Sequence, residues 1–98
     1  MIGRRVGTVA EIVRPGDYCG PISSYTGEVE SCFFLLPTSR DVEAAVGGRS
    51  IHHVAFPPHT YRECPDGSLE IRASIGAEPF WHGYLDEGHS WRGVGEWG

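Results

Sequence analysis

Two turn signatures in the second half of the sequence constrain the fold more than any other feature. Pro65–Asp66–Gly67 and Asp86–Glu87–Gly88 both end in glycine, which tolerates the left-handed backbone that closes a three-residue hairpin loop. Segments with apolar residues at alternate positions flank both turns, as expected of strands with one buried face. The sequence therefore predicts two consecutive β-hairpins near the C-terminus.

Charged residues decide the register expected for the first hairpin. A two-residue loop, Asp66–Gly67, would place Glu63 opposite Glu70, and like charges directly opposite destabilise a strand pair. A three-residue loop places Arg62 opposite Glu70 instead, so we expect this second register. Side chains then alternate between two faces. The expected buried face carries Leu69, Ile71, Ala73 and Ile75, and the outward face carries Ser68, Glu70, Arg72 and Ser74.

The second hairpin is expected to pair residues 80–85 with residues 89–92. In this register Gly83 faces Trp91, and the missing side chain leaves room for the indole. The hairpin then has one polar and one aromatic face. The polar face carries His82, Tyr84, Ser90 and Arg92, and the aromatic face carries Trp81, Leu85, His89 and Trp91.

The remaining segments complete a mainly β fold. Strands are expected over 7–13, 29–36 and 50–56, a long loop over 16–28, one short helix over about 38–46, and a frayed tail over 93–98. This density of strands and turns predicts a small antiparallel sandwich or a partly open barrel. With 98 residues, the chain is expected to form a single domain, 1–98, because it can build one core but not two.

Composition narrows the classes of partner. Eight arginines and no lysine stand against thirteen acidic residues, and the net charge of −5 argues against broad nucleic-acid binding. No apolar run approaches the roughly 20 residues of a membrane span, and no secretory signal is recognisable. Cys19, Cys32 and Cys64 are odd in number and include no close pair, which favours reduced thiols and a cytoplasmic protein.

The polar face of the second hairpin is the strongest candidate binding site. His82, Tyr84 and Arg92 combine an imidazole, a phenol and a fixed cation, a set suited to a polar or anionic ligand. Arg72, on the outward face of the first hairpin, is expected to join them, with Trp91 as a wall. The alternative interpretation is an ordinary solvated sheet face above an aromatic core.

Histidine and cysteine offer an alternative metal site. His59, Cys64 and His82 have the donor chemistry that zinc prefers. The sequence contains neither a Cys-x-x-Cys pair nor two histidines four residues apart, so no cofactor is expected. No cysteine lies beside a histidine in the sequence, and the chain is expected not to be an enzyme.

The segment from His53 to Arg92 carries a pattern of short motifs. It contains Asp66–Gly67–Ser68–Leu69, Ala73–Ser74–Ile75 and Trp81–His82–Gly83–Tyr84–Leu85. This pattern resembles a group of small uncharacterised proteins from actinobacteria and their phages, which implies the same strands and a phage or prophage setting. It is also distantly similar to a broader family of unknown function in which a Cys-His step before the last hairpin suggests a metal. Trp81 stands in place of that cysteine here.

Three functions remain as hypotheses. The first is a non-enzymatic binding module, such as a phage accessory protein that captures a small polar or anionic ligand or a host protein. The second is a virion or assembly protein that associates with itself through exposed aromatic side chains and strand edges. The third is a metal-dependent hydrolase that uses His59, Cys64 and His82.

Overall fold

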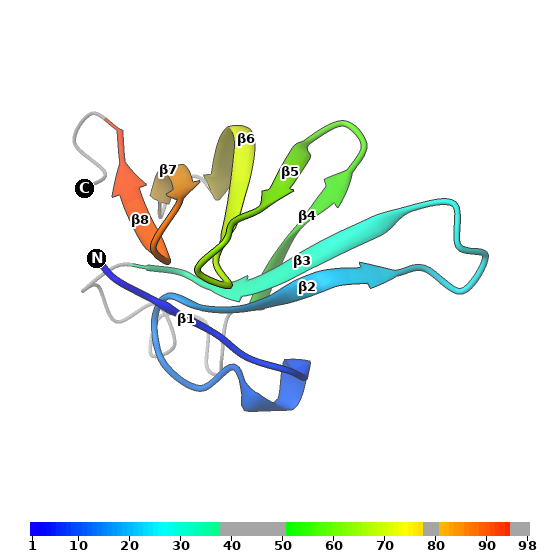
Figure 1. Cartoon of the computed structure of the whole chain (residues 1–98), viewed down its shortest axis with the longest axis horizontal. Helices are drawn as coiled ribbons and strands as arrows, with labels where there is room; N and C mark the ends of the chain where they lie inside the picture. The colour runs from blue at the N-terminus through cyan, green and yellow to red at the C-terminus, as the bar shows by residue number, and fades with distance from the viewer. Residues whose placement is uncertain (38–50, 78–80, 95–98) are drawn as a thin grey trace.

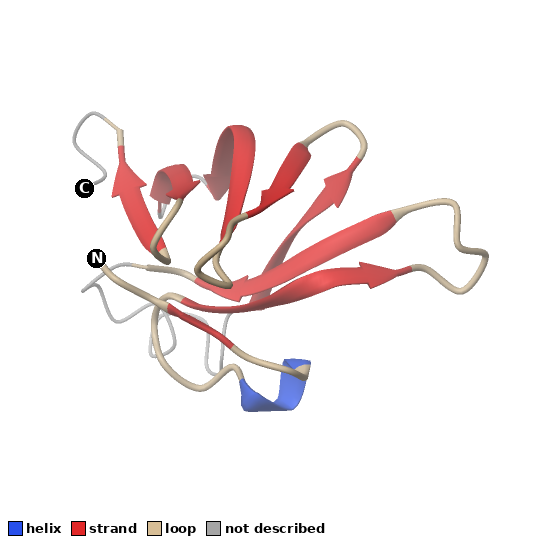
Figure 2. Ribbon diagram, in the orientation of Figure 1, coloured by secondary structure: helices blue, strands red, loops and turns tan. Residues whose placement is uncertain are grey.

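The computed structural model describes residues 1–37, 51–77 and 81–94, which form two four-stranded sheets (Figures 1 and 2). The first sheet contains β1 (Arg4–Arg5), β2 (Asp17–Ser23), β3 (Glu30–Leu35) and β4 (Ile51–Phe56). The second contains β5 (Thr60–Glu63), β6 (Leu69–Ala77), β7 (Trp81–Asp86) and β8 (Ser90–Gly93). Strands follow one another in chain order within each sheet, and all neighbours are antiparallel except β1 and β2.

The main core lies between the two sheets. Its aromatic centre is Trp91, whose ring contacts Tyr18, Phe34 and Trp81 at centroid distances of 5.3–5.9 Å. The other buried members come from both sheets: Cys32, Leu36, Val54, Phe56, Leu69, Ile71, Ile75, Ala77 and Leu85. Burial of one face of each sheet against the other defines a small β sandwich, which confirms the predicted fold class.

Hydrogen bonds join the two sheets at one end of the sandwich. The indole Nε1–H of Trp91 donates to the carbonyl of Gly16 at 2.8 Å. The Leu69 amide donates to the Tyr18 hydroxyl at 3.2 Å, and the same hydroxyl lies 2.6 Å from His89 Nδ1. The Tyr18 hydroxyl therefore connects the Leu69 amide to the His89 ring.

The prediction of a strand over 7–13 was wrong, and the side chain of Asp17 gives the reason. That segment contains η1 (Val9–Glu11) instead, and only Arg4–Arg5 pairs as β1. The carboxylate of Asp17 accepts from the amides of Val13 and Arg14, both at 3.0 Å. These amides are therefore not available to a sheet ladder, and the chain turns there instead of continuing as a strand.

The predicted loop 16–28 was wrong over its first half. Asp17–Ser23 forms β2 despite its glycine and proline, because Tyr18 and Cys19 are buried and pair with β3. The register shifts between Cys19 and Ile22, which accommodates the Gly20–Pro21 step. A Cβ atom at Gly20 would lie only 2.8 Å from the Ser31 carbonyl oxygen, so this close pairing requires glycine.

The predicted register of the first hairpin is confirmed. Arg62 pairs with Glu70, and Gly67 takes the left-handed conformation at φ +86°. Two side chains lie on the other face from the one expected: Ala73 is exposed and Ser68 is fully buried. The register between β6 and β7 shifts between Ile71 and Ile75. Ala73 lies within this irregular stretch and therefore does not follow the alternation of buried and exposed side chains along β6.

The predicted register of the second hairpin was wrong by two residues. Leu85 pairs with Trp91, and the loop consists of residues 87–89. A shift of two keeps every side chain on its predicted face, because strand side chains alternate with period two. Gly83 makes room for Trp81 and for the backbone carbonyl of Arg92, and not for the Trp91 ring.

The strands expected over 29–36 and 50–56 are confirmed as β3 and β4. The expected helix over 38–46 lies outside the described residues. Of the tail expected to fray, Gly93 ends β8 and the Val94 amide donates to the His82 carbonyl at 2.9 Å. The three cysteines carry free, buried thiols. In the described ranges, no helix is long and apolar enough to cross a bilayer.

Candidate functional site

The outer face of the second sheet gathers two arginines around one tyrosine. Tyr84 of β7 pairs directly with Arg92 of β8, and the Arg92 guanidinium carbon lies 4.3 Å from the centre of the Tyr84 ring. The guanidinium of Arg72, from β6, lies 5.2 Å from the same ring. The negative face of an aromatic ring attracts cations at such distances. Three strands thus bring together three of the residues predicted from the sequence.

Asp86 joins the two arginines. Its Oδ2 atom accepts from Arg92 Nε at 2.9 Å, and its Oδ1 atom accepts from Arg72 Nη2 at 2.8 Å. Partial burial alone would raise the pKa of Asp86, but the hydrogen bonds from Arg92 and Arg72 outweigh it and hold the pKa below its ordinary value. The carboxylate is therefore charged at neutral pH and fixes both guanidinium groups.

Sequence reasoning missed Asp86, because the predicted register placed it in the turn. The signal that could have found it is the alternation of β7. His82, Tyr84 and Asp86 occupy every second position, so a strand extended by one residue carries all three on the same face.

The two arginines differ in how much of each guanidinium is already bonded. Arg72 Nη1 donates to the carbonyls of Ile71 and Leu85 at 2.8 and 3.2 Å, in addition to its bond with Asp86. Arg92 donates through Nε alone, and its Nη1 and Nη2 atoms have no acceptor among residues 1–37, 51–77 and 81–94. Arg92 is also 54% exposed. Arg72 therefore supports the cluster, and Arg92 is the arginine that can bind an added group.

His82 and Trp91, the other two predicted site residues, take different positions. His82 is half-buried on the same face as Tyr84 and pairs with Gly76. Trp91 is only 3% exposed and lies on the opposite face of the sheet, in the core. The prediction that Trp91 forms a wall of the binding site was therefore wrong, although its aromatic face was assigned correctly.

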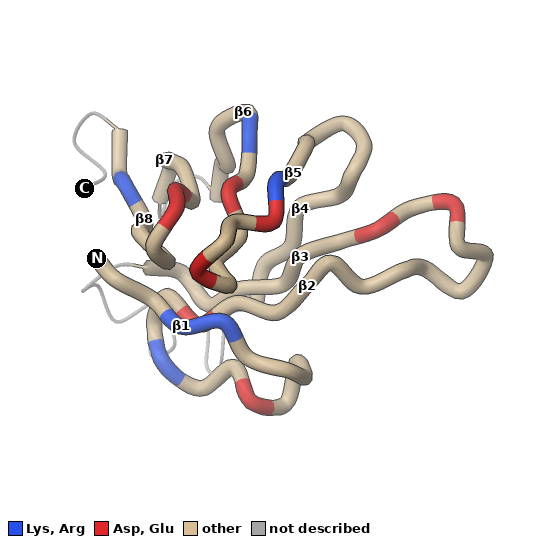
Figure 3. Tube along the Cα trace, in the orientation of Figure 1, with Lys and Arg blue, Asp and Glu red and all other residues tan. Residues whose placement is uncertain are grey.

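Further charges surround the cluster on the same sheet (Figure 3). Glu70 lies 3.7 Å from Arg72 and 3.3 Å from Arg62, and Glu87 lies 3.5 Å from Arg62. These ion pairs are solvent-exposed, and each contributes no more than about 1 kcal/mol. Their main effect is on the local charge: Glu87 pairs with Arg62, Glu70 lies between Arg62 and Arg72, and Asp86 pairs with both Arg72 and Arg92.

The alternative metal set is not brought together. His59 precedes β5 and Cys64 follows it, at opposite ends of the strand, and the His59 ring contacts the Ser74 carbonyl at 3.0 Å. One group of candidate ligand atoms does converge within the described ranges, formed by Cys64, Asp66 and Glu87. Asp66 already accepts from the Ser68 amide and hydroxyl, so this group is explained by turn structure.

Comparison with family models, curated protein sequences and solved structures returns no match, so the functional argument depends on the geometry of the site.

Proposed function

We propose that this chain is a non-enzymatic binding domain that holds a carboxylate or phosphate group on the outer face of its second sheet. Arg92 is the observation that carries the proposal. Its guanidinium is held in place by Tyr84 and Asp86, yet both of its terminal nitrogens lack an acceptor among the described residues. A guanidinium that is already oriented loses less conformational entropy when it binds a planar or tetrahedral anion.

The cluster around Arg92 is neutral, in spite of the acidic composition. Arg72 and Arg92 carry two positive charges and are paired with Asp86 and Glu70, which carry two negative charges, so the ion pairs leave no excess of negative charge there. The whole chain carries −5 and repels anions at long range, so recognition depends on direct contact with Arg92. One charge-assisted pair at an exposed position supports a dissociation constant on the order of millimolar.

The wider setting is also a proposal. The motifs of residues 53–92 resemble those of actinobacterial and phage proteins, and we propose a phage accessory role in a reducing compartment. The three buried free thiols support the choice of compartment. The cluster of Arg72, Tyr84, Asp86 and Arg92 contains no nucleophile beside a general base, which supports binding over catalysis.

Titration of 15N-labelled protein with acetate and with inorganic phosphate tests the proposal. At constant ionic strength, we expect the Arg92 Nε–H signal to shift and to saturate with at least one of the two anions. Acetate and phosphate separate the two chemical classes. Arg92→Ala should abolish the saturating shifts of neighbouring amides in β7.

Arg62→Ala is the matched control, because Arg62 lies on the same sheet and is 51% exposed. This variant should titrate like the wild type. If neither anion gives a saturating shift, or if Arg92→Ala titrates like the wild type, the cluster does not bind anions and the proposal is wrong.

A further inference from the structure

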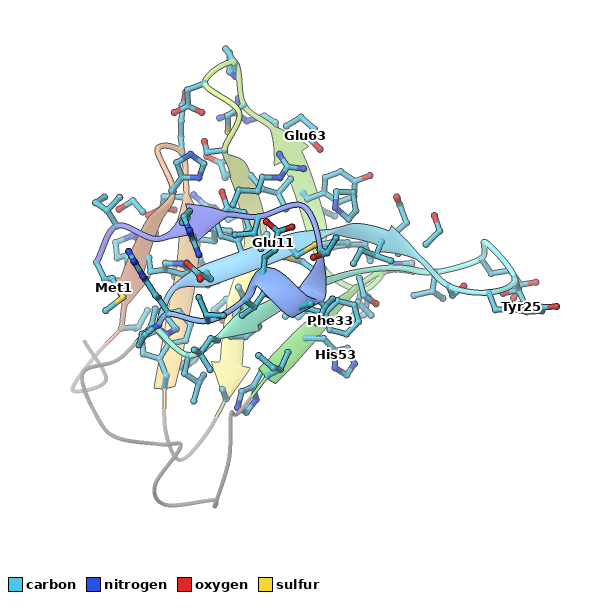
Figure 4. All side chains as sticks on the ribbon, turned by 90° about the horizontal axis from the view of Figure 1, so that it is seen from below. Met1, Glu11, Tyr25, Phe33, His53 and Glu63 are labelled. Carbon is cyan, nitrogen blue, oxygen red and sulfur yellow. The ribbon has the colours of Figure 1, made fainter. Side chains whose placement is uncertain are left out.

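The β2–β3 hairpin projects from the body of the sandwich as an arm (Figures 1 and 4). We define the arm as residues 22–30, the last two residues of β2, the first of β3 and the loop between them. Tyr25 is fully exposed at its tip, and Ile22 and Val29 are more than a third exposed. None of these three side chains belongs to the main core or to the smaller buried cluster of Ile12, Cys19 and Leu35. The arm therefore carries apolar surface that contributes nothing to the core.

Local hydrogen bonds give the arm a defined shape. The Ser24 amide donates to the Val29 carbonyl at 2.7 Å, and the Gly27 amide donates to the Ser24 carbonyl at 2.9 Å. The left-handed Gly27, at φ +77°, closes the turn. An aromatic side chain on an ordered hairpin loses little entropy on binding, and tyrosine is among the residues that contribute most to protein interfaces.

Two further exposed apolar side chains, Ile2 and Val13, lie near the opposite end of β2. The described residues contain seven large exposed apolar side chains, and the four outside the arm are Met1, Ile2, Val13 and Val94. Val13 is hydrogen-bonded through its amide to Asp17, the first residue of β2, and Ile2 precedes β1, which pairs with the same end. Figure 4 shows Met1 and Tyr25 at opposite ends of the molecule. We call Ile2, Val13 and Arg14 the basal patch.

The charges of the arm and the basal patch are opposite in sign. The arm contains no basic residue, and its acidic residues are the exposed Glu28 and the half-buried Glu30, whose carboxylate accepts from the Tyr61 hydroxyl. The basal patch contains Arg14, which is exposed and whose guanidinium has no partner in the part of the chain that the structure describes. Complementary charges orient an encounter and select one pairing over others. A second copy of this chain therefore offers the arm both an apolar surface and a charge of the required sign.

We infer that the arm of one molecule docks on the basal patch of a second copy, so that the chain associates head to tail. Because the two surfaces differ and lie at opposite ends of β2, the contact is heterologous and repeats from molecule to molecule. The net charge of −5 opposes non-specific association, so the contact depends on these two surfaces. The inference goes beyond the anion site at Arg92, which lies outside both surfaces.

Two variants that each disable one surface test the inference. Tyr25→Ser removes the aromatic tip of the arm, and Val13→Ser/Arg14→Ser removes the apolar and charged groups of the basal patch. Both changes leave the backbone amides that bond to Asp17 in place, so melting temperatures should stay close to that of the wild type. Sedimentation velocity then gives the molecular mass of each protein, up to about 1 mM because a small interface binds weakly.

Head-to-tail association predicts a specific pattern of masses. The wild-type mass should rise with concentration from 10.7 kDa and continue beyond the dimer. Each variant alone should remain monomeric, with self-association weakened at least tenfold. An equimolar mixture of the two should form a dimer of 2 × 10.7 = 21.4 kDa and stop there, because its two free ends are the disabled arm and the disabled patch.

Other outcomes overturn the inference. A symmetric arm-to-arm contact would let the Val13→Ser/Arg14→Ser variant associate by itself, and a patch-to-patch contact would let Tyr25→Ser do so. A wild-type protein that stays monomeric up to 1 mM would show that the arm does not bind a second copy. The binding partner of the arm would then be a different protein. Arg62→Ser, a change at an exposed position outside both surfaces that removes one positive charge as Arg14→Ser does, is the control for a general effect of charge.

Discussion

The Asp17 side chain is buried and accepts hydrogen bonds from Arg4 and from two backbone amides. Burial would raise its pKa, but the hydrogen bonds from Arg4, Val13 and Arg14 outweigh that effect and lower the pKa below the ordinary value of 3.8. A carboxylate with a lowered pKa in the folded protein stabilises the fold above its ordinary pKa. This stabilisation is lost as the pH falls through the lower, folded-state value.

We therefore expect Asp17→Asn to lower the free energy of unfolding by about 1–3 kcal/mol at pH 7, because the amide cannot accept from all three donors. Arg4 is 52% exposed, so its charge stays hydrated and the cost stays below that of a fully buried broken pair. Urea unfolding of the variant and the wild type between pH 7 and pH 2 measures the difference. It should shrink as the pH falls below about 4, and a difference independent of pH would contradict the role given to the carboxylate.

At the scale of elements, the β7–β8 hairpin requires a glycine at position 83. We predicted from the sequence that Gly83 makes room for Trp91, but its neighbours in the structure are different. Gly83 faces the Arg92 carbonyl and the Trp81 ring, and a Cβ atom would lie 2.6 Å from Trp81 Cζ2. Neither the backbone of β8 nor the buried Trp81 can move without disturbing the core. Trp81 is 1% exposed and contacts Trp91 edge to face.

Gly83→Ala should therefore destabilise the fold by about 1–3 kcal/mol through overpacking. Gly76→Ala is the matched control, since Gly76 lies in the neighbouring strand β6 and has nothing within 4 Å of its Cβ position. The control should be neutral or slightly stabilising. Chemical denaturation of both variants gives the comparison, and equal effects at the two positions would rule out the packing argument.

The two hairpins also show which registers can be predicted from sequence. The first depends on a local charge pair, Arg62 with Glu70, and was predicted correctly. The second depends on contacts from the N-terminal half: the Gly3 amide donates to the His89 carbonyl, and Tyr18 bonds to the His89 ring. These contacts hold His89 in a left-handed conformation at φ 59°, which moves the three-residue loop from 86–88 to 87–89. No pattern within the hairpin itself reveals them.

The candidate site could likewise be predicted only in part. The alternation of side chains correctly predicted that Tyr84 and Arg92 lie on one face of the sheet. The predicted register was wrong by two residues, and a shift of two leaves each side chain on the same face. The same alternation assigned Trp91 to the aromatic face, and only its use as a ligand wall was wrong. Asp86 was missed because it belongs to a strand only when the three-residue loop lies at 87–89 and not at 86–88.

At the scale of the whole molecule, Tyr18 connects the two sheets. It is fully buried, and burial raises its pKa to about 12, so its hydroxyl stays protonated and can donate to His89. The same hydroxyl accepts from the Leu69 amide at the start of β6. One side chain of the first sheet thus bonds to polar groups of the second sheet at the start of β6 and in the β7–β8 loop.

Tyr18→Phe should cost about 1–3 kcal/mol of unfolding free energy, because it leaves the Leu69 amide buried without its partner. Amide exchange should accelerate at Leu69 and in the loop 87–89. Tyr25→Phe removes a hydroxyl that is fully exposed and should change neither quantity. Equal protection of Leu69 in the wild type and in Tyr18→Phe would show that the hydroxyl does not join the sheets.

The chain-order arrangement of the strands has a consequence for the speed of folding. Because neighbours in each sheet are also neighbours in sequence, most pairings close short loops, and the entropy of loop closure grows with loop length. Each sheet can therefore form hairpin by hairpin, whereas the pairing of one sheet with the other depends on non-local contacts, which slow folding. The contacts that span the sequence are concentrated where Gly3, Gly16 and Tyr18 meet β8 and its loop. Docking at this junction is the step that brings the first residues of the chain against the last strand.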